Sequence, residues 1–506
     1  MLFNSSVFVF VFMPVVFAGY FLIAKKSHQG ALAWLTLASI FFYAYWSIKA
    51  LPVLVISICI NYWFGALLTK QELKYRQALL ILAITANLVA LGYYKYINFF
   101  IDNINDMRDL MELDPWDSIN IFLPIGISFF TFTQIAFLID NYQGKVKERN
   151  FIQYTLFVSF FPHLLAGPLL HHRQMMPQFS MPENFVIQKE KIVTGLLIFT
   201  VGLAKKILIA DTLNSYLSTF YNSLAQGAKP NFLASWTACV GYTFQLYFDF
   251  SGYSDMAVGT ALLFGIYLPF NFNSPFRATS IIDLWQRWHI TLTKYVGEYL
   301  YTPITLQFMR LGQNLPSAFG FIFSLVIPTV FIFLIIGFWH GANWTYVVFG
   351  GMHGLYIVTN HLWRKLFPLP SKKNKNNQSH KTIKMVAAWT LTFLVVNIAS
   401  VMFRSDSIPT AVVVYKGMLG FNGYSLGNMP DIQTWIFSLK IILLTMISAF
   451  LIVFLMPNTI SIASSSEKIF TGKRVLTYVS IVILIGIIYS LLQLNFYESP
   501  FLYFQF

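Results

Sequence analysis

The chain of 506 residues is 57% hydrophobic and 18% aromatic but only 11% charged, and its mean hydropathy of +0.61 excludes an ordinary soluble domain. Its formal net charge of +14 does not indicate nucleic-acid binding, because the Lys and Arg residues lie in short loops between apolar runs and form no basic face. The composition therefore predicts a membrane protein, with no nucleic-acid partner.

Apolar runs recur along the chain and predict an all-α polytopic protein with roughly 10 to 13 membrane helices. The linkers are too short for a separate soluble domain, so we expect residues 1–506 to form one integral membrane domain. The predicted spans are residues 2–23, 31–47, 51–68, 78–100, 121–139, 192–210, 232–249, 319–338, 344–362, 385–402, 434–456 and 475–494.

The charges of the loops alternate in sign. Residues 70–76 are basic, 102–117 are acidic, and the loop after residue 139 is basic again. Basic loops favour the cytoplasmic side. We therefore predict that both termini lie outside.

The apolar segment 151–170 is interrupted by Pro162 and Gly167 and runs into His171 and His172. Such a segment is typical of a broken or re-entrant helix. Together with His163, these histidines suggest metal binding, but no carboxylate or cysteine stands at ligand spacing, so we expect no metal. The two cysteines of the chain lie in apolar runs and predict no disulfide framework.

Two histidines, His340 and His353, lie in a stretch that is otherwise apolar, aromatic and rich in glycine. Burying an imidazole there is costly and calls for a reason. One interpretation is a general base, since a neutral imidazole accepts a proton from a hydroxyl near neutral pH. The other is a packing histidine that bonds neighbouring carbonyls across a helix interface.

Polar residues are dense at 245–255, where Asp249, Tyr253 and Asp255 are expected to fall between two spans. Either they line a wet or ligand-filled space, or they form a network that fixes helix packing.

The stretch 280–294 predicts a single amphipathic helix at the membrane interface, with a serine N-cap. On such a helix Asp283 and Arg287 pair, while Trp285 and His289 share a face. Its histidine either contributes to chemistry or belongs to a simple interfacial anchor.

Five short motifs stand out: FWHG at 338–341, RWHITL at 287–292, QLYFDFSGYSDMAVG at 245–259, NFNSPF at 271–276 and the opening MLFNS. Together they resemble the membrane-bound O-acyltransferase family. Within it the chain is similar to the branch of alginate and peptidoglycan O-acetylation proteins of the bacterial cytoplasmic (inner) membrane, and more distantly to the teichoic-acid D-alanylation protein. Each is weak alone, but their shared order and spacing are specific.

The resemblance implies a ring of membrane helices around a central funnel or tunnel. It also implies that His340 is the family's essential histidine and His289 its second functional position. We treat as supporting residues His353, Asp249, Tyr253, Asp255, Arg287, Trp339 and Asn343.

The implied function is transfer of an acetyl group from a cytoplasmic thioester, expected to be acetyl-CoA, for O-acetylation of an exported polysaccharide. An alginate-like acceptor is our first choice and peptidoglycan the second, reached through a secreted or periplasmic partner enzyme. His340 acts as general base, and His289 positions the donor or stabilises developing charge. We expect no tightly bound cofactor.

The alternative function is a proton-coupled transporter or flippase for an acylated or anionic carrier, with the histidines as proton relays. The motif match and the lack of paired repeats argue against it.

Overall fold

The computed structural model describes residues 1–146, 150–165, 167–313, 316–367, 378–424, 432–469 and 501–502, and within these ranges the chain forms helices and loops without a β-strand. Two compact units are present. The first contains described residues of Met1–Ala204, Gly252–Phe270 and Thr459–Gln505, and the second those of Lys205–Ser251 and Asn271–Asn458. A single domain stays a prediction.

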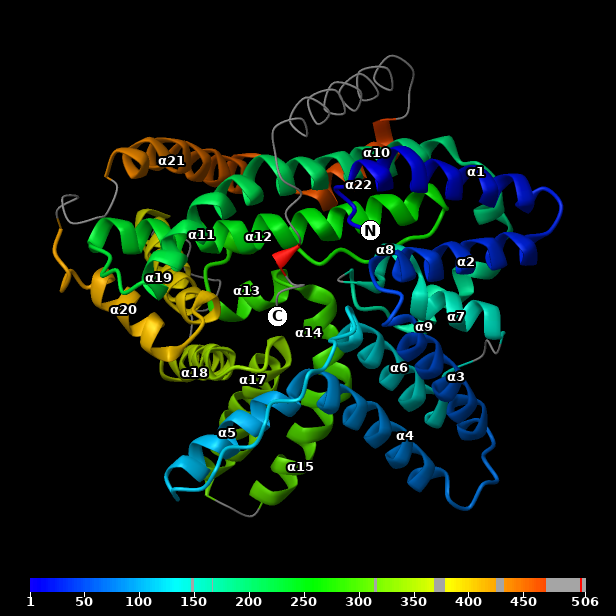
Figure 1. Cartoon of the computed structure of the whole chain (residues 1–506), viewed down its shortest axis with the longest axis horizontal. Helices are drawn as coiled ribbons and strands as arrows, with labels where there is room; N and C mark the ends of the chain where they lie inside the picture. The colour runs from blue at the N-terminus through cyan, green and yellow to red at the C-terminus, as the bar shows by residue number, and fades with distance from the viewer. Residues whose placement is uncertain are drawn as a thin grey trace. The chain divides into compact units, whose positions relative to one another are not determined.

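In the first unit, α1 packs along α2, where Trp34 Nε1 donates a hydrogen bond of 3.1 Å to the carbonyl of Val16. Figure 1 shows these two helices in blue. The α-helices of this unit are α1 Met13–Ala24, α2 His28–Trp46, α3 Leu51–Leu68, α4 Arg76–Leu91, α5 Ile97–Asp109, α6 Ile127–Tyr142, α7 Phe151–Ser159, α8 Phe161–Leu164, α9 His172–Met175, α10 Lys189–Ala204 and α22 Thr459–Ile469. Shorter 3-10 or π segments are η1 Phe8–Phe12, η2 Gly92–Tyr96, η3 Met176–Ser180 and η4 Pro182–Phe185.

The second unit holds the predicted histidine site. Its α-helices are α11 Thr212–Ala225, α13 Ile281–Arg287, α14 Ile290–Val296, α15 Thr302–Gly312, α16 Ser317–Phe321, α17 Ile327–His340, α18 Trp344–Leu366, α19 Gln378–Arg404, α20 Ile408–Met418 and α21 Ile432–Leu455. Its 3-10 or π segments are η5 Lys205–Asp211, η6 Pro275–Arg277, η7 Gly297–Tyr301 and η8 Ile322–Val326. Helix α12 (Phe232–Leu263) belongs to both units, which divide after Ser251.

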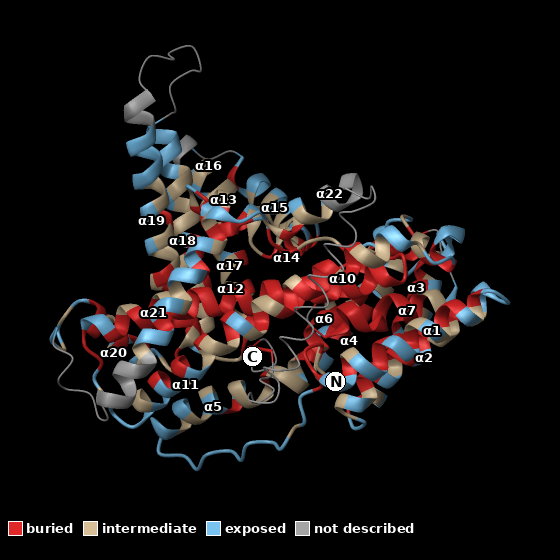
Figure 2. Ribbon diagram, turned by 90° about the horizontal axis from the view of Figure 1, so that it is seen from above, coloured by how far each residue is buried: buried red, intermediate tan, exposed pale blue. Residues whose placement is uncertain are grey.

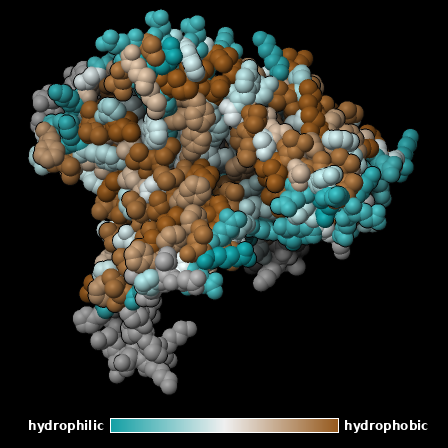
Figure 3. Space-filling view, turned by 90° about the horizontal axis from the view of Figure 1, so that it is seen from below, coloured by the Kyte–Doolittle hydropathy of each residue, from teal (hydrophilic) through white to brown (hydrophobic). Residues whose placement is uncertain are grey.

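Within the described residues, 5 helices are long and apolar enough to cross a membrane: Leu51–Leu68, Arg76–Asp109, Lys189–Ala225, Phe319–His340 and Thr382–Arg404. These helices carry exposed apolar side chains such as Ile56, Trp63 and Val89, and Figure 3 shows brown apolar side chains over much of the face in view. Such exposure suits contact with lipid. The multi-pass all-α class is confirmed, whereas the count of roughly 10 to 13 helices and the central funnel stay predictions.

Most of the predicted spans correspond to helices. The span at 51–68 coincides with α3, and the interruption predicted in 151–170 is present, because α7 ends at Ser159 and α8 begins at Phe161 after a non-helical Phe160. The span predicted at 475–494 lies outside the described residues.

The sequence prediction was wrong about 245–255, which forms the middle of α12 and does not link two helices. Figure 2 shows α12 as buried over most of its length. The polar side chains fit inside this helix because they find partners: Gln245 Nε2 donates to Asn214 Oδ1 at 2.9 Å, and Asp249 pairs with Lys206. The mean hydropathy of a sequence segment does not show that its polar side chains pair with residues elsewhere in the chain.

The prediction of one continuous helix over 280–294 was also wrong. Helix α13 ends at Arg287, and α14 begins at Ile290 after His289, whose φ of 41° is in the left-handed region. Trp285 and His289 therefore do not share a helix face. Two local features are confirmed: Ser280 Oγ accepts the Asp283 amide at 3.2 Å, and Arg287 Nε pairs with Asp283 at 2.7 Å.

Helices α17 and α18 pack closely through glycines. A Cβ on Gly337 would overlap the carbonyl of Tyr346, and a Cβ on Gly350 would overlap the carbonyl of Phe333. Small residues at helix crossings let the backbones approach. The two helices that carry His340 and His353 are thereby held in direct contact.

We predict that Gly350→Ala lowers the free energy of unfolding by about 1–3 kcal/mol, since the methyl group has backbone in its way. The matched control is Gly351→Ala, whose Cβ would meet only Leu334 Cδ2 at 3.4 Å. Thermal unfolding of the purified proteins in detergent measures both. Equal melting temperatures for the two variants would contradict this packing.

Candidate active site

His340 is the last residue of α17, and it is only 7% exposed. The helix continues through Gly337 and stops because Gly341 takes an extended conformation, with φ −166° and ψ 155°. The chain then turns into α18, whose N-cap is Asn343; its Oδ1 accepts the Thr345 amide at 2.9 Å. The helix therefore ends at Gly341, which places His340 at the buried turn.

Aromatic rings connect His340 with His353. Phe349 lies between them, with centroid distances of 6.3 Å to His340 and 4.6 Å to His353, and Phe403 closes over His340 at 5.1 Å. Trp339, 5% exposed, lies against His340 at 5.0 Å. We call these five residues the ring cluster. In this cluster the rings of Trp339, Phe349 and Phe403 pack against the two imidazoles.

Helix α13 joins the ring cluster through Trp285. Its indole Nε1 donates to His353 Nδ1 at 3.3 Å, and the two rings meet edge to face at 5.2 Å. Accepting this bond leaves the proton of a neutral His353 on Nε2. His353 is thus orientated by α13, which favours a supporting role.

His289 is 1% exposed and caps α14 with its own ring, because Nδ1 accepts the Leu292 amide at 3.3 Å. An amide N–H only donates, so Nδ1 carries the lone pair and Nε2 the proton. Phe250 covers the ring at 4.7 Å. Helix α13, seven residues long, is too short to cross a bilayer, whereas α14 continues without a break through η7 and α15 to Gly312. Burial lowers the pKa of His289 to about 3, so its ring is neutral at pH 7.

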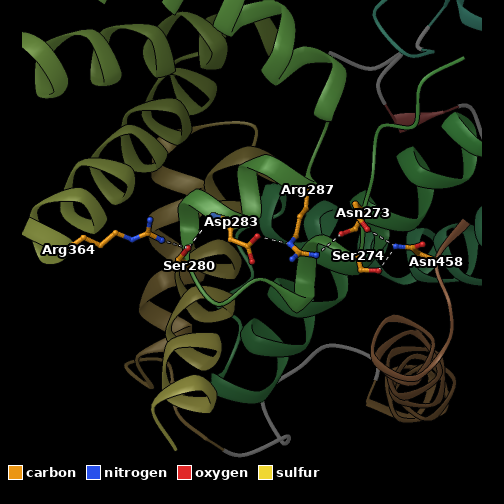
Figure 4. Close-up of polar contacts among 7 residues, drawn as sticks. All are labelled: Asn273, Ser274, Ser280, Asp283, Arg287, Arg364 and Asn458. Carbon is orange, nitrogen blue, oxygen red and sulfur yellow. Dashed lines mark hydrogen bonds and ion pairs between the residues drawn. The ribbon is translucent and has the colours of Figure 1, made fainter. Parts of the chain in front are cut away.

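A series of polar contacts connects α13 with its neighbours in the second unit (Figure 4). Arg364 Nη2 donates to Ser280 Oγ at 3.1 Å, and Arg287, paired with Asp283, donates to the carbonyl of Asn273 at 3.4 Å. Asn458 Nδ2 continues the series to Asn273 Oδ1 at 2.8 Å and to Ser274 Oγ at 3.1 Å. The contacts of Arg287 therefore fix α13 and the loop at 271–277.

Asp249 belongs to a buried ion cluster. Lys206 Nζ lies 2.6 Å from Asp249 Oδ1 and 2.7 Å from Asp211 Oδ1, and the Lys206 side chain is 5% exposed. Removing one member of such a buried ion pair leaves an uncompensated charge, which destabilises the fold. The cluster ties η5 to α12, and the sequence did not predict it, because Asp249 lies 43 residues from Lys206.

Tyr253 and Asp255 lie on the part of α12 that belongs to the first unit. Tyr253 stacks on Phe3 at 4.8 Å and on Phe501 at 4.5 Å, and Asp255 Oδ2 accepts the Thr459 hydroxyl at 2.7 Å. The ring cluster belongs to the second unit. Their supporting role stays a prediction.

A histidine and carboxylate pair in the first unit was not predicted from the sequence. His172 Nδ1 lies 3.0 Å from Asp140 Oδ2, with both side chains buried. Asp140 belongs to α6 and is distant from His172 in the chain. In the part of the chain that the structure describes, no group of three His, Cys, Asp or Glu side chains is arranged to hold a metal ion.

Residues 36–405 match the family model of MBOAT, the membrane-bound O-acyltransferase family. The chain belongs to this family. Similar proteins include the peptidoglycan O-acetyltransferase of Helicobacter pylori, which is 39% identical over 85% of this chain and 82% of its own. The probable alginate O-acetylase AlgI of Pseudomonas aeruginosa is 35% identical over 85% and 77%, and the teichoic acid D-alanyltransferase of Bacillus subtilis is 27% identical over 50% and 64%.

The chain is therefore an O-acyltransferase and a multi-pass membrane protein. Family membership does not itself assign residues. The roles of His340 and His289 remain proposals that rest on the geometry above.

We predict that Lys206→Met lowers the free energy of unfolding of this O-acyltransferase by about 3–5 kcal/mol, because it removes the cation that pairs with the buried Asp249 and the partly exposed Asp211. Lys205→Met is the matched control; Lys205 Nζ bonds the Ser251 hydroxyl at 3.0 Å, and its loss should cost about 1 kcal/mol. Thermal unfolding in detergent compares them. If Lys206→Met unfolds at the wild-type temperature, the cluster does not stabilise the fold.

Proposed function

We propose that this O-acyltransferase takes an acetyl group from acetyl-CoA on the cytoplasmic side of a bacterial inner membrane and transfers it for O-acetylation of an exported polysaccharide. The names of its relatives support both the acetyl group and the glycan. Alginate was the first choice from the sequence, while the 39% identity to a peptidoglycan enzyme against 35% for AlgI favours peptidoglycan. Both acceptors are therefore tested below.

The observation that carries this proposal is the burial of His340 at the end of α17, within the ring cluster. An imidazole in its neutral form can accept a proton from a hydroxyl, and the aromatic rings around His340 limit the access of bulk water to it. A general base needs that state at the pH of the cell, and a site protected from bulk water strengthens its interaction with a reacting hydroxyl.

The proposed reaction conserves every atom. The acceptor hydroxyl gives its proton to His340, and its oxygen forms a bond to the thioester carbonyl carbon. The carbonyl oxygen gains negative charge, which the Nε2–H of His289 stabilises. When the carbonyl re-forms, the carbon–sulfur bond breaks, and the proton on His340 passes to the departing CoA sulfur.

The immediate acceptor we propose is the serine hydroxyl of a secreted or periplasmic partner enzyme, which then acetylates the glycan. Both chain termini are proposed to lie outside, as the alternation of loop charges indicates. Transport of a carrier without acyl transfer, the alternative function, is disfavoured by family membership.

We predict that His340→Ala lowers acetyl transfer by about 10²- to 10⁴-fold, the usual contribution of a general base. A strain lacking this gene is complemented with wild type, His340→Ala or the control His361→Ala, at matched membrane levels. Base-released acetate is then measured on its peptidoglycan and on its uronic-acid exopolysaccharide.

Wild type and His361→Ala should restore acetate on one of the two glycans, and His340→Ala on neither. Normal acetate with His340→Ala would refute the assignment of the base. Unchanged acetate on both glycans in the deletion strain would refute the proposed acceptor classes.

A further inference from the structure

The loop at 271–273 pairs with the break between α13 and α14. The Ile290 amide donates to the carbonyl of Asn271 at 2.9 Å, and the Asn273 amide donates to the carbonyl of Arg287 at 2.9 Å. These two bonds bracket His289. They place Asn271 beside the residue that directly follows His289.

The orientation of the Asn271 side chain is determined by Thr291. Oδ1 of Asn271 lies 2.6 Å from the Thr291 hydroxyl and 3.4 Å from the Thr291 amide. Because an amide N–H only donates, the atom facing it is the oxygen of Asn271, and the NH₂ group points the other way. Asn271 is 1% exposed.

Two buried donors result, Nδ2 of Asn271 and Nε2 of His289, and neither has a hydrogen-bond partner among the residues that the structure describes. Each of them costs about 1–3 kcal/mol when left unsatisfied. The other polar atom of each side chain already has a partner: Asn271 Oδ1 accepts from the Thr291 hydroxyl, and His289 Nδ1 accepts from the Leu292 amide. A pre-organised site for an oxygen acceptor requires buried N–H groups that are held in place and have no other partner. The side chains of Asn271 and His289 meet both conditions.

We infer that Asn271 is a further catalytic residue, whose Nδ2–H donates together with Nε2–H of His289 to the carbonyl oxygen of the acyl thioester. Both donors are neutral, which suits an oxygen that gains charge only as the acceptor attacks. The inference rests on the proposed function, and it adds a second donor to the step in which carbonyl oxygen becomes an oxyanion and then returns to a carbonyl.

The matched pair of variants is Asn271→Asp and Thr291→Val. Asn271→Asp keeps the oxygen that Thr291 contacts but replaces the donor by a group that donates only when protonated. Thr291→Val removes the hydroxyl contact and keeps the donor. If Asn271 merely anchored the loop, the two variants would lose activity to the same extent and equally at every pH.

The assay measures release of CoA thiol from acetyl-CoA by the full-length protein in native membranes with cell envelopes as acceptor, from about pH 6 to about pH 9. We expect Asn271→Asp to lose about 10²-fold in kcat at the alkaline end, as for the removal of one oxyanion donor. The ratio of its rate to wild type should rise as pH falls, because the introduced carboxyl, whose pKa burial raises, becomes a donor again. Thr291→Val should lose less activity than Asn271→Asp and by the same factor at every pH, because it loosens the position of the donor but introduces no group that titrates.

Binding of CoA alone, which lacks the carbonyl, should be equal in wild type and Asn271→Asp. The inference is overturned if Asn271→Asp releases CoA thiol at the wild-type rate at every pH, which is the result expected if the two donors bind only water. It is also overturned if the two variants lose activity equally at every pH. Wild-type membranes without acetyl transfer, or His340→Ala membranes with normal transfer, would instead count against the proposed function itself.

Discussion

The reversal of the chain at His289 is the constraint on which the site depends. A non-glycine residue with φ of 41° is strained, and the structure compensates this with the cap that its own ring gives to α14. The same bond fixes the tautomer. The backbone at His289 thus sets the orientation of the imidazole, and the imidazole in turn stabilises the backbone. The position of the buried Nε2–H therefore follows from the local fold.

Around this reversal, the second unit holds its helices by contacts of different kinds. Polar contacts connect α13 with its neighbours, glycines bring α17 against α18, and Trp285 links α13 to His353 inside. His340 therefore lies on a packed scaffold and not on a mobile loop. An acyltransferase needs this rigidity because the reacting atoms must be held within a fraction of an ångström.

Local features were predictable from the sequence, and those that depend on distant partners were not. The serine cap and the Asp283–Arg287 pair follow from spacing on one helix. The break at His289 depends on the loop at 271–273, and α12 continues through Asp249 because Lys206, 43 residues away, neutralises it. The sequence motifs indicated His340 and His289. The role of the Asn271 NH₂ group depends on the contact between Asn271 Oδ1 and Thr291, which only the structure shows.

The most direct test of the account is an experimental structure of the full-length protein with an unreactive ketone analogue of acetyl-CoA. The account predicts the ketone oxygen within about 3 Å of His289 Nε2 and Asn271 Nδ2, with the imidazole of His340 facing the carbonyl carbon across room for one hydroxyl. A ketone bound away from both donors, or a His340 ring turned toward lipid, would contradict it.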